Sequence, residues 1–488
     1  PAEVEACLKN DTRGAFVKVV DKVLASPRYG ERWAGHWLDL VRFGETHGFE
    51  TNRERPNAWP YRDWVIHSFN DDKPYNQFVR EQLAGDQLPG STRRQLIASG
   101  YNRLNMTTRE GGSQPKEYIA IYLGDRVRNV SGVWMATTLG CTECHDHKFD
   151  PFTSRDFYSL GAFFSDLEET PVGPQKYTPL PTTAQQAKVD KLKKQIPVLE
   201  AVLNTQTPAL DDALARWESA QAERIASEPS AEADANGTEP AVSDGKPTAD
   251  SAAPPKKIGE ILAVPLAKRS DKQKKTLAAH YRTIAPELAG ARKELAGLKA
   301  RIKQLEKAFP TSLVSVRLAK PRTVRILPRG NWQDESGPEV QPTVPARLKL
   351  ADTESRAKRS DLADWVVSKD NPLTARVMVN RLWALCFGRG LAVPLDDFGA
   401  QGTPPTHPEL LDWLAADFMD HGWDIKRTMK LLVTSGAYRQ SSIADAKTLA
   451  ADPLNKWLAR QGRWRLDAEM VRDNALAVSG LLAKPIGG

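Results

Sequence analysis

Two stretches of apolar residues, repeating at intervals of three and four, constrain the fold of this chain more than any other feature. The first runs from Val189 to Leu203, and the second runs from Leu288 to Leu305. Such spacing is typical of coiled-coil helices, and two stretches of matching length most simply pair as an antiparallel hairpin. Between them, residues 227–255 are rich in Ala, Ser, Pro, Asp and Glu and hold almost no large apolar side chain. That composition predicts a disordered tip, because the segment cannot bury enough surface to offset its ordering entropy.

The predicted hairpin, residues 181–310, divides the chain into two flanking segments. In residues 1–175, apolar side chains recur at the spacing of amphipathic helices. In residues 312–488, apolar and polar residues first alternate near Val314, which predicts a small β element, and helical spacing resumes beyond Asp361. We therefore predict a mainly α fold with two helical domains and small β additions, separated by an antiparallel coiled-coil hairpin.

The composition argues against several classes of protein. Hydrophobic residues make up 40% and charged residues 26% of the 488 positions, which is ordinary for a globular protein. The net charge is +7, but no run of Lys and Arg with interleaved aromatic residues marks a nucleic-acid groove. No run of about 18 apolar residues occurs, so no transmembrane segment is expected. Both ends, Pro1 and Gly488, look like cuts, so we expect an export signal or a further domain beyond them and a truncated C-terminal domain.

The run Cys141-Thr142-Glu143-Cys144-His145 matches the attachment signature of a c-type haem. In such a site each cysteine sulfur adds to a haem vinyl group, and the adjacent histidine ligates the iron. With 4 cysteines and 8 histidines in 488 residues, chance rarely produces this spacing. We therefore predict one covalent haem c, with Cys141 and Cys144 as anchors and His145 as the iron ligand. Its attachment would require an exported, oxidising compartment.

Other interpretations of the same loop stay open. A C-x-x-C pair also forms disulfides, and Cys and His together bind zinc. The sequence holds no second C-x-x-C, so a zinc ion would need ligands from distant parts of the chain. A carboxylate cluster without haem would instead suit calcium or another hard cation.

The ligand on the other face of the iron is not evident from the spacing. His147 follows His145 too closely to reach the opposite face, so we assign it a supporting role or another ligand. The candidates are Met106, Met135 and His47, of which a methionine would favour pure electron transfer. An open position would instead permit oxygen or peroxide chemistry.

Further runs stand out on both sides of the predicted hairpin. In the first segment they are Glu31-Arg32-Trp33, His36-Trp37-Leu38-Asp39-Leu40, Arg55-Pro56-Asn57-Ala58-Trp59, Phe78-Val79-Arg80-Glu81-Gln82-Leu83-Ala84-Gly85-Asp86, Asp125-Arg126-Val127 and Cys144-His145-Asp146-His147-Lys148-Phe149-Asp150-Pro151. In the last segment they are Val379-Asn380-Arg381-Leu382-Trp383, Phe387-Gly388-Arg389-Gly390-Leu391, Asp396-Asp397-Phe398-Gly399 and Tyr438-Arg439-Gln440-Ser441. In these runs the chain resembles the cytochrome-associated domain of large exported planctomycete proteins, followed by its usual partner domain. The resemblance covers about residues 5–170 and 312–488.

The resemblance implies a location and a partner. Proteins of this family are exported and belong with polysaccharide degradation, which suggests redox work on sugars. They usually carry a separate cytochrome c-like domain upstream, which would serve as the redox partner of this chain.

Charged residues in or beside these runs form the predicted catalytic group. Carboxylates beside an imidazole suit proton abstraction from a sugar hydroxyl, with the haem accepting the electrons afterwards. Arg126 would orient a carboxylate or a sulfated sugar through its planar fork. The alternative is structural, with Asp125–Arg126 and Lys148–Asp150 as buried ion pairs that fix the loop. The candidates are Glu110, Glu117, Asp125, Arg126, Asp146, His147, Lys148 and Asp150.

We therefore predict a periplasmic or otherwise exported c-type haem protein that transfers electrons in the oxidation of carbohydrates. Whether it is itself an oxidoreductase stays open. The alternatives are a non-haem glycan-binding or scaffold module, with a metal or a disulfide at the cysteine loop, and a metal-dependent hydrolase built on Asp146, His147 and Asp150. Cys386, among apolar residues, is expected to be a core thiol. In the C-terminal segment, the polar residues expected to face a cleft are Asn380, Arg381, Asp396, Asp397, His407 and Arg439.

Overall fold

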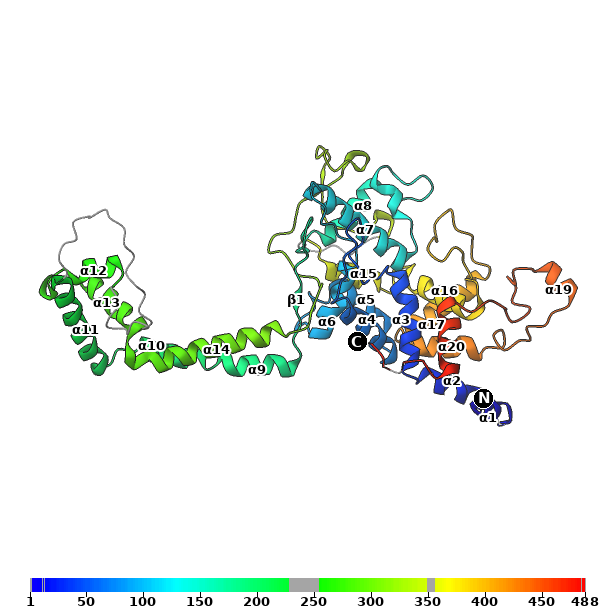
Figure 1. Cartoon of the computed structure of the whole chain (residues 1–488). Helices are drawn as coiled ribbons and strands as arrows, with labels where there is room; N and C mark the ends of the chain where they lie inside the picture. The colour runs from blue at the N-terminus through cyan, green and yellow to red at the C-terminus, as the bar shows by residue number, and fades with distance from the viewer. Residues whose placement is uncertain are drawn as a thin grey trace. The chain divides into compact units, whose positions relative to one another are not determined.

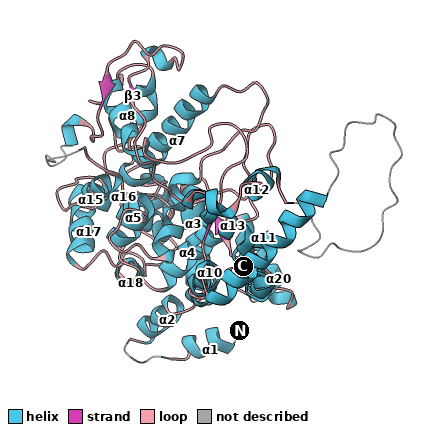
Figure 2. Ribbon diagram, turned by 90° about the vertical axis from the view of Figure 1, so that its left-hand side faces the viewer, coloured by secondary structure: helices cyan, strands magenta, loops and turns pink. Residues whose placement is uncertain are grey.

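The computed structural model of the chain describes residues 2–227, 254–348 and 356–487, apart from residues 11, 13 and 484. Helices dominate the described chain, and strand occurs only in short pieces (Figures 1 and 2). The mainly α fold with small β additions is therefore confirmed. The chain forms two compact units, one made of residues 1–180 and 311–488 and the other of residues 181–310.

The N-terminal part of the first unit is a succession of amphipathic helices. Pro27 separates the second helix from the third, because proline fixes its own backbone and restricts the residue before it. The last two helices, α7 and α8, pack against each other, and the loop that connects them carries the cysteine motif. The helices are α1 (Ala2–Leu8), α2 (Ala15–Leu24), α3 (Arg28–Leu40), α4 (Trp59–Asn70), α5 (Tyr75–Ala84), α6 (Arg93–Ala98), α7 (Pro115–Met135) and α8 (Ser154–Gly161).

The C-terminal part of the same unit begins with short strands and continues with helices. The strands β1 (Thr178–Pro179) and β2 (Thr311–Ser312) pair antiparallel, as do β3 (Val324–Arg325) and β4 (Glu339–Val340). The helices are α15 (Arg359–Val366), α16 (Thr374–Phe387), α17 (Pro408–Asp420), α18 (Ile425–Thr434), α19 (Ala446–Ala451) and α20 (Ala468–Ser479).

The predicted β element near Val314 is only partly a strand. Its alternating residues run as extended chain whose amides bond to neighbouring loops and turns. The Ser315 amide donates to Ser99 Oγ at 3.1 Å, and the Leu318 amide donates to the Asp166 carbonyl at 2.6 Å. Among the described residues near Val314, strand pairing is limited to β2 and to an antiparallel bridge between Arg317 and Leu167.

An aromatic core joins the two ends of the chain. Trp37 of α3 packs on Phe78 of α5 and on Trp134 of α7, with ring centroids 4.9 and 5.0 Å apart. From the C-terminal part, Trp423 packs on Tyr75 at 6.2 Å. Burial of such large rings stabilises the folded unit. The segments on either side of the insertion therefore fold around shared side chains.

A buried arginine adds a polar joint to this core. Arg359, at the start of α15, has no solvent exposure and reaches the two carboxylate oxygens of Asp86 at 2.7 Å each. Its Nε donates to Asp166 Oδ1 at 3.0 Å. The guanidinium donates hydrogen bonds to both carboxylates and offsets their negative charge, because buried charged groups require such partners.

The second unit, residues 181–310, is helical but differs from the predicted hairpin. The two apolar stripes do meet, since Val189 lies in one cluster with Leu298 and Ile302. The first stripe is nevertheless broken into α9 and α10, because Pro197 near the start of α10 cannot donate to the preceding turn. A coiled-coil hairpin of two matching helices is therefore not confirmed. The helices are α9 (Thr183–Lys193), α10 (Ile196–Asn204), α11 (Pro208–Ser227), α12 (Lys256–Leu262), α13 (Asp271–Ile284) and α14 (Ala289–Lys307).

A further helical cluster in this unit has no counterpart in the prediction. Trp217 of α11 packs on Tyr281 of α13 with ring centroids 5.6 Å apart, and Ile258 and Leu262 of α12 join the same core. The predicted disordered tip at 227–255 lies almost wholly outside the described residues. Within the described chain, no helix combines the length and the apolar character needed to cross a membrane.

Candidate functional site

The cysteine loop, residues 136–153, connects α7 to α8. Helix α7 ends where Ala136 adopts a left-handed backbone. Thr153 caps the start of α8, and its side chain forms a capping box with that of Asp156. Between these ends a 3₁₀ turn spans Leu139–Glu143. The Thr142 hydroxyl donates to the Leu139 carbonyl at 2.6 Å, which turns Thr142 inward. Its neighbours Cys141 and Cys144 are exposed free thiols.

His145 is exposed and directly follows Cys144 in the sequence. Its Nδ1 lies 2.8 Å from the carbonyl oxygen of Asp146, so Nδ1 carries the proton and donates it. This hydrogen bond leaves the Nε2 lone pair as the ligating atom of the ring. A backbone carbonyl on one ring nitrogen is a common way to orient a metal-binding histidine.

His147 has the opposite character, because its side chain is buried. The Asp150 amide donates to Nδ1 at 2.9 Å, so the ring proton sits on Nε2, which faces Thr138 Oγ1 at 3.2 Å. Both ring nitrogens therefore hold the loop together. This geometry favours the structural alternative for His147 over catalysis.

Asp150 connects the cysteine loop to the C-terminal part of the unit. Its buried carboxylate accepts the Ala400 amide at 2.7 Å and lies against Gly399, where an added Cβ would stand 2.4 Å from Oδ2. The neighbouring Phe398 amide donates to the Ala136 carbonyl at 2.7 Å. The turn at residues 397–400 therefore binds the cysteine loop at both ends, at Ala136 and near Asp150.

Replacing Gly399 by alanine is expected to destabilise the folded protein by about 1–3 kcal/mol, because the new Cβ must displace a carboxylate held by hydrogen bonds. Chemical denaturation would measure the loss. The displaced loop should also make Cys141 and Cys144 react faster with a thiol reagent. Gly436→Ala is the matched control, since a Cβ there meets no atom within 4 Å. Equal stability of the two variants would contradict the role of Asp150 in binding the loop to this turn.

A second contact from the C-terminal part reaches the end of α7. The buried Arg381 donates to the carbonyls of Val133 and Gly132, the latter at 2.8 Å. Cations are favourable at this end of a helix because its last carbonyls lack partners. Burial lowers the pKa of Arg381, and the opposing influence of Tyr75 and Asp396 is smaller. Arg381 and Asn380, which bonds Ala392 in both directions, thus hold backbone and do not face a cleft.

The remaining predicted residues of the loop lie at its surface. Asp146 is exposed and accepts the Ser154 amide at 2.8 Å, which supports the start of α8. Lys148 is exposed, with Nζ 5.1 Å from the Phe149 ring centroid. The predicted Lys148–Asp150 ion pair is therefore not formed. The Asp150 carboxylate instead accepts the Ala400 amide, and the Asp150 amide donates to His147 Nδ1.

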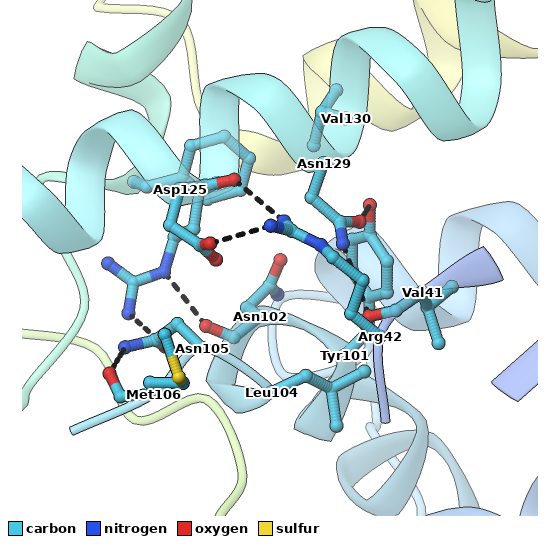
Figure 3. A pocket seen from close by; sticks show the side chains of 12 residues that line it. Val41, Arg42, Tyr101, Asn102, Leu104, Asn105, Met106, Asp125, Asn129 and Val130 are labelled. Carbon is cyan, nitrogen blue, oxygen red and sulfur yellow. Dashed lines mark hydrogen bonds and ion pairs between the residues drawn. The ribbon is translucent and has the colours of Figure 1, made fainter. Parts of the chain in front are cut away.

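Asp125 and Arg126 line a separate cavity of about 210 Å³ (Figure 3). Asp125 accepts from Arg42 at 2.9 Å, at the rim. Arg126 is buried and donates to the Asn102 carbonyl at 2.8 Å and to Asn105 Oδ1 at 3.1 Å. Asp125 and Arg126 do not pair with each other, so that predicted ion pair is also wrong.

The partner of Arg126 is Glu169, a residue that is not among the predicted site residues. The guanidinium holds both carboxylate oxygens, at 3.1 and 2.5 Å, and Arg322 adds a contact at 2.9 Å. Burial opposes the ionisation of Glu169, but Arg126, Arg103 and Arg322 together hold its pKa below the ordinary value. No local signal in the sequence marks Glu169. Because its carboxylate occupies Arg126, that arginine is not open to a sugar acid.

Arg126 also lines a second, larger cavity of about 450 Å³. Apolar side chains from α7, such as Ile119 and Leu123, form one wall, and Tyr158 and Trp332 add aromatic surface. The charges at its rim are already paired, as in Lys116 with Glu335 at 2.9 Å. Cys141, Cys144 and His145 line neither cavity.

Of the other predicted catalytic residues, Glu110 is exposed beyond the cavities and Glu117 lies half-buried in the first turn of α7. The candidate iron ligands are scattered. Met135 is buried in the core, and Met106 lines the smaller cavity and touches Gly48. His47 is enclosed, with Thr107 Oγ1 at 2.6 Å and the Tyr177 hydroxyl at 3.2 Å. Met135 therefore lies directly before the cysteine loop with its side chain in the core, whereas Met106 and His47 belong to other segments.

His47 predicts a dependence of stability on pH. Burial, with Arg55 and Arg109 nearby, lowers its pKa from 6.5 to about 4. A histidine with a lowered folded pKa binds its proton more readily when unfolded, so stability falls as pH falls from 6.5 towards 4. Chemical denaturation at pH 7 and pH 4.5 would measure the unfolding free energy of the wild type and of His47→Gln. Between these two pH values the wild type should lose more unfolding free energy than the variant. The exposed His67→Gln serves as control; an unchanged slope in His47→Gln would contradict the assignment.

Within the described chain, no group of three or more His, Cys, Asp or Glu side chains is arranged to hold a metal ion. Cys386 is buried in the core as predicted, with Sγ 3.9 Å from Met429 Sδ, and burial raises the pKa of its thiol to about 12.

Comparison with known families matches the two parts of the first unit separately. Residues 1–169 match the family PSCyt2, described as a protein of unknown function (DUF1549). Residues 358–488 match the family PSD1, described as a protein of unknown function (DUF1553). Searches of curated proteins and of solved structures gave no match.

Proposed function

Because the chain belongs to the planctomycete cytochrome-associated family, in which a PSCyt2 domain is followed by a PSD1 domain, we propose that it is an exported redox protein carrying one covalent c-type haem. Cys141 and Cys144 would hold the haem through thioether bonds, and His145 would ligate the iron. Attachment of this kind takes place outside the cytoplasm, which supports a periplasmic or otherwise exported location. An upstream cytochrome c domain is the redox partner that the family suggests.

The state of the three donors carries this proposal. Thioether formation needs reduced, reachable sulfurs, and Cys141 and Cys144 are free and exposed. Iron ligation needs an imidazole nitrogen with an available lone pair. The bond from His145 Nδ1 to the Asp146 carbonyl leaves Nε2 in that condition. Two reachable sulfurs and an available imidazole nitrogen are the kinds of donor that a covalent haem requires.

The surrounding residues would keep the donors in place. Glu143, between the two cysteines, pairs with Arg128, and its carbonyl accepts the Tyr158 hydroxyl at 2.9 Å. His147 and Asp150 fix the chain after His145, as described above. A haem held here would supply one-electron transfer. Because the loop lies at the surface, a second redox protein can approach it directly, which favours electron relay. Carbohydrate oxidation as the source of the electrons is supported by the family resemblance.

The test is a pyridine haemochrome spectrum of denatured protein made in a periplasm with cytochrome c maturation proteins. We expect a c-type α-band that survives acid–acetone extraction. Cys141→Ser combined with Cys144→Ser should lose all attached haem, while Cys386→Ser should keep it, since that thiol is buried in the core. His145→Ala should alter the spectrum of the native protein.

A colourless wild-type protein of apo mass, beside a working maturation control, would overturn the proposal. Metal analysis and thiol titration would then separate the remaining alternatives for the loop. Bound metal would favour a structural site or a metal-dependent hydrolase, and two missing thiols would favour a disulfide in a glycan-binding or scaffold module.

A further inference from the structure

A third cavity, of about 590 Å³, lies in the PSD1 part of the chain. It is formed between the end of α16 and the loops before and after α19, residues 442–464. Three arginines line it, Arg389, Arg460 and Arg463, and no Asp or Glu is among the described residues of its wall. The cavity is therefore strongly cationic. A neutral or positively charged ligand would not balance it.

Several polar atoms around this cavity are buried without a partner. In the described structure they are Nε of Arg389, Nη1 of Arg460, Oδ1 of Asn455 and Oε1 of Gln461. The orientation of the Asn455 amide is set, because its Nδ2 donates to the Arg460 carbonyl at 2.7 Å. An unpaired buried polar group costs about 1–3 kcal/mol, so each of these four atoms gains from a polar partner, which water or a ligand in the cavity would supply.

An indole completes the wall. Trp464 is 49% exposed and packs closely on two glycines. A Cβ at Gly388 would stand 2.5 Å from the indole, and a Cβ at Gly462 would stand 2.1 Å from it. Any side chain at these two positions would displace the ring. The glycines therefore allow a half-exposed indole at a defined place beside the arginines.

We propose that this cavity binds an anionic carbohydrate, a sugar ring that bears a sulfate or a carboxylate. The planar guanidinium groups of Arg389 and Arg460 suit the oxygens of sulfate and carboxylate. The unpaired amide oxygens of Asn455 and Gln461 would accept hydrogen bonds from sugar hydroxyls, which an inorganic anion does not offer. The Trp464 indole supplies an apolar face for the C–H side of the ring. This binding goes beyond the proposed redox function, because none of its groups belongs to the cysteine loop.

Titration calorimetry at physiological salt with the full chain made without haem would test the site. The probes are sulfated glucan oligosaccharides from dextran sulfate and the matching unsulfated dextran oligosaccharides. We expect binding of the sulfated probe and none of the unsulfated one. Arg389→Gln and Trp464→Ala should each weaken binding about tenfold, the loss of one charged or stacking contact.

The controls separate a built site from general attraction of anions. Arg301→Gln removes the same charge from exposed surface on α14 and should leave the affinity unchanged. Arg389→Gln should keep the melting temperature of the unliganded protein, because Arg389 has no partner to lose in the described chain. Polyphosphate of equal charge should compete poorly. Equal weakening by Arg301→Gln, full competition by polyphosphate or no binding by the wild type would each overturn the proposal. The absence of haem in this experiment keeps its outcome independent of the redox function.

Discussion

Replacing Arg359 by methionine is expected to destabilise the folded protein by about 3–5 kcal/mol, because two buried carboxylates lose the cation between them. Arg359 has no solvent exposure and makes four hydrogen bonds to Asp86 and Asp166. Burial alone would lower its pKa, but the two carboxylates raise it, so the guanidinium remains charged. Urea denaturation of the full chain would measure the loss.

Arg376→Met is the matched control for this prediction. Arg376 forms its ion pair with Asp412 at the surface, with side chains 36% and 59% exposed. Such a pair contributes about 0–1 kcal/mol, so its loss should hardly change the denaturation midpoint. Replacing Asp86 and Asp166 by leucine in the Arg359→Met background should recover part of the stability. A loss under about 1 kcal/mol in the single variant would mean that packing alone joins the two parts of the core.

Arg126→Met is expected to cost about 3 kcal/mol at pH 7, because Glu169 would keep its buried charge with weaker compensation. The Glu169 carboxylate is 2% exposed, and Arg322 would remain beside it. Asp125, the neighbour of Arg126 in sequence, offers the control: Asp125→Asn removes a carboxylate paired with the exposed Arg42 and should cost less than about 1 kcal/mol.

The pH dependence of the Arg126→Met effect identifies its cause. In the wild type the pKa of Glu169 is lowered, so its stabilising contribution is full above the ordinary pKa of 4.5 and is lost as pH falls through the folded value. In the variant the same pKa should rise, and protonation at acid pH relieves the buried charge. The difference in unfolding free energy should therefore shrink between pH 7 and pH 4. A constant difference would assign the loss to packing and not to charge.

Local patterns predicted much of the secondary structure and little of the charge pairing. Apolar spacing indicated the helices of both outer segments, and the burial of Cys386 followed from its apolar neighbours. The ion pairs did not follow. Asp125 and Arg126 are adjacent in sequence yet turn to different partners, Arg42 and Glu169. A charged side chain pairs with whatever the fold brings near, and sequence neighbours on a helix point in different directions.

In the inserted unit, residues 181–310, the packing of the helices was likewise only partly predictable from the sequence. The two apolar stripes were recognised, and their side chains meet in the structure. Pro197 was the signal that breaks the first stripe, and it was present in the sequence. The cluster of Trp217, Ile258 and Tyr281 was not predictable in the same way, because its members come from three helices whose contacts are not local.

The sequence by itself determined the chemistry that depends on neighbouring residues. Two thiols and an imidazole fall within five positions of the sequence, so Cys141, Cys144 and His145 could be proposed as haem donors without a structure. Only the tertiary structure decided what the surrounding charged residues do. Asp150 binds the backbone of the 397–400 turn, and both ring nitrogens of His147 bond within the cysteine loop. Arg126 forms its ion pair with Glu169. Which residues are neighbours along the chain can be read from the sequence. Compensation of a buried charge depends instead on which distant groups the folded core brings within hydrogen-bond distance.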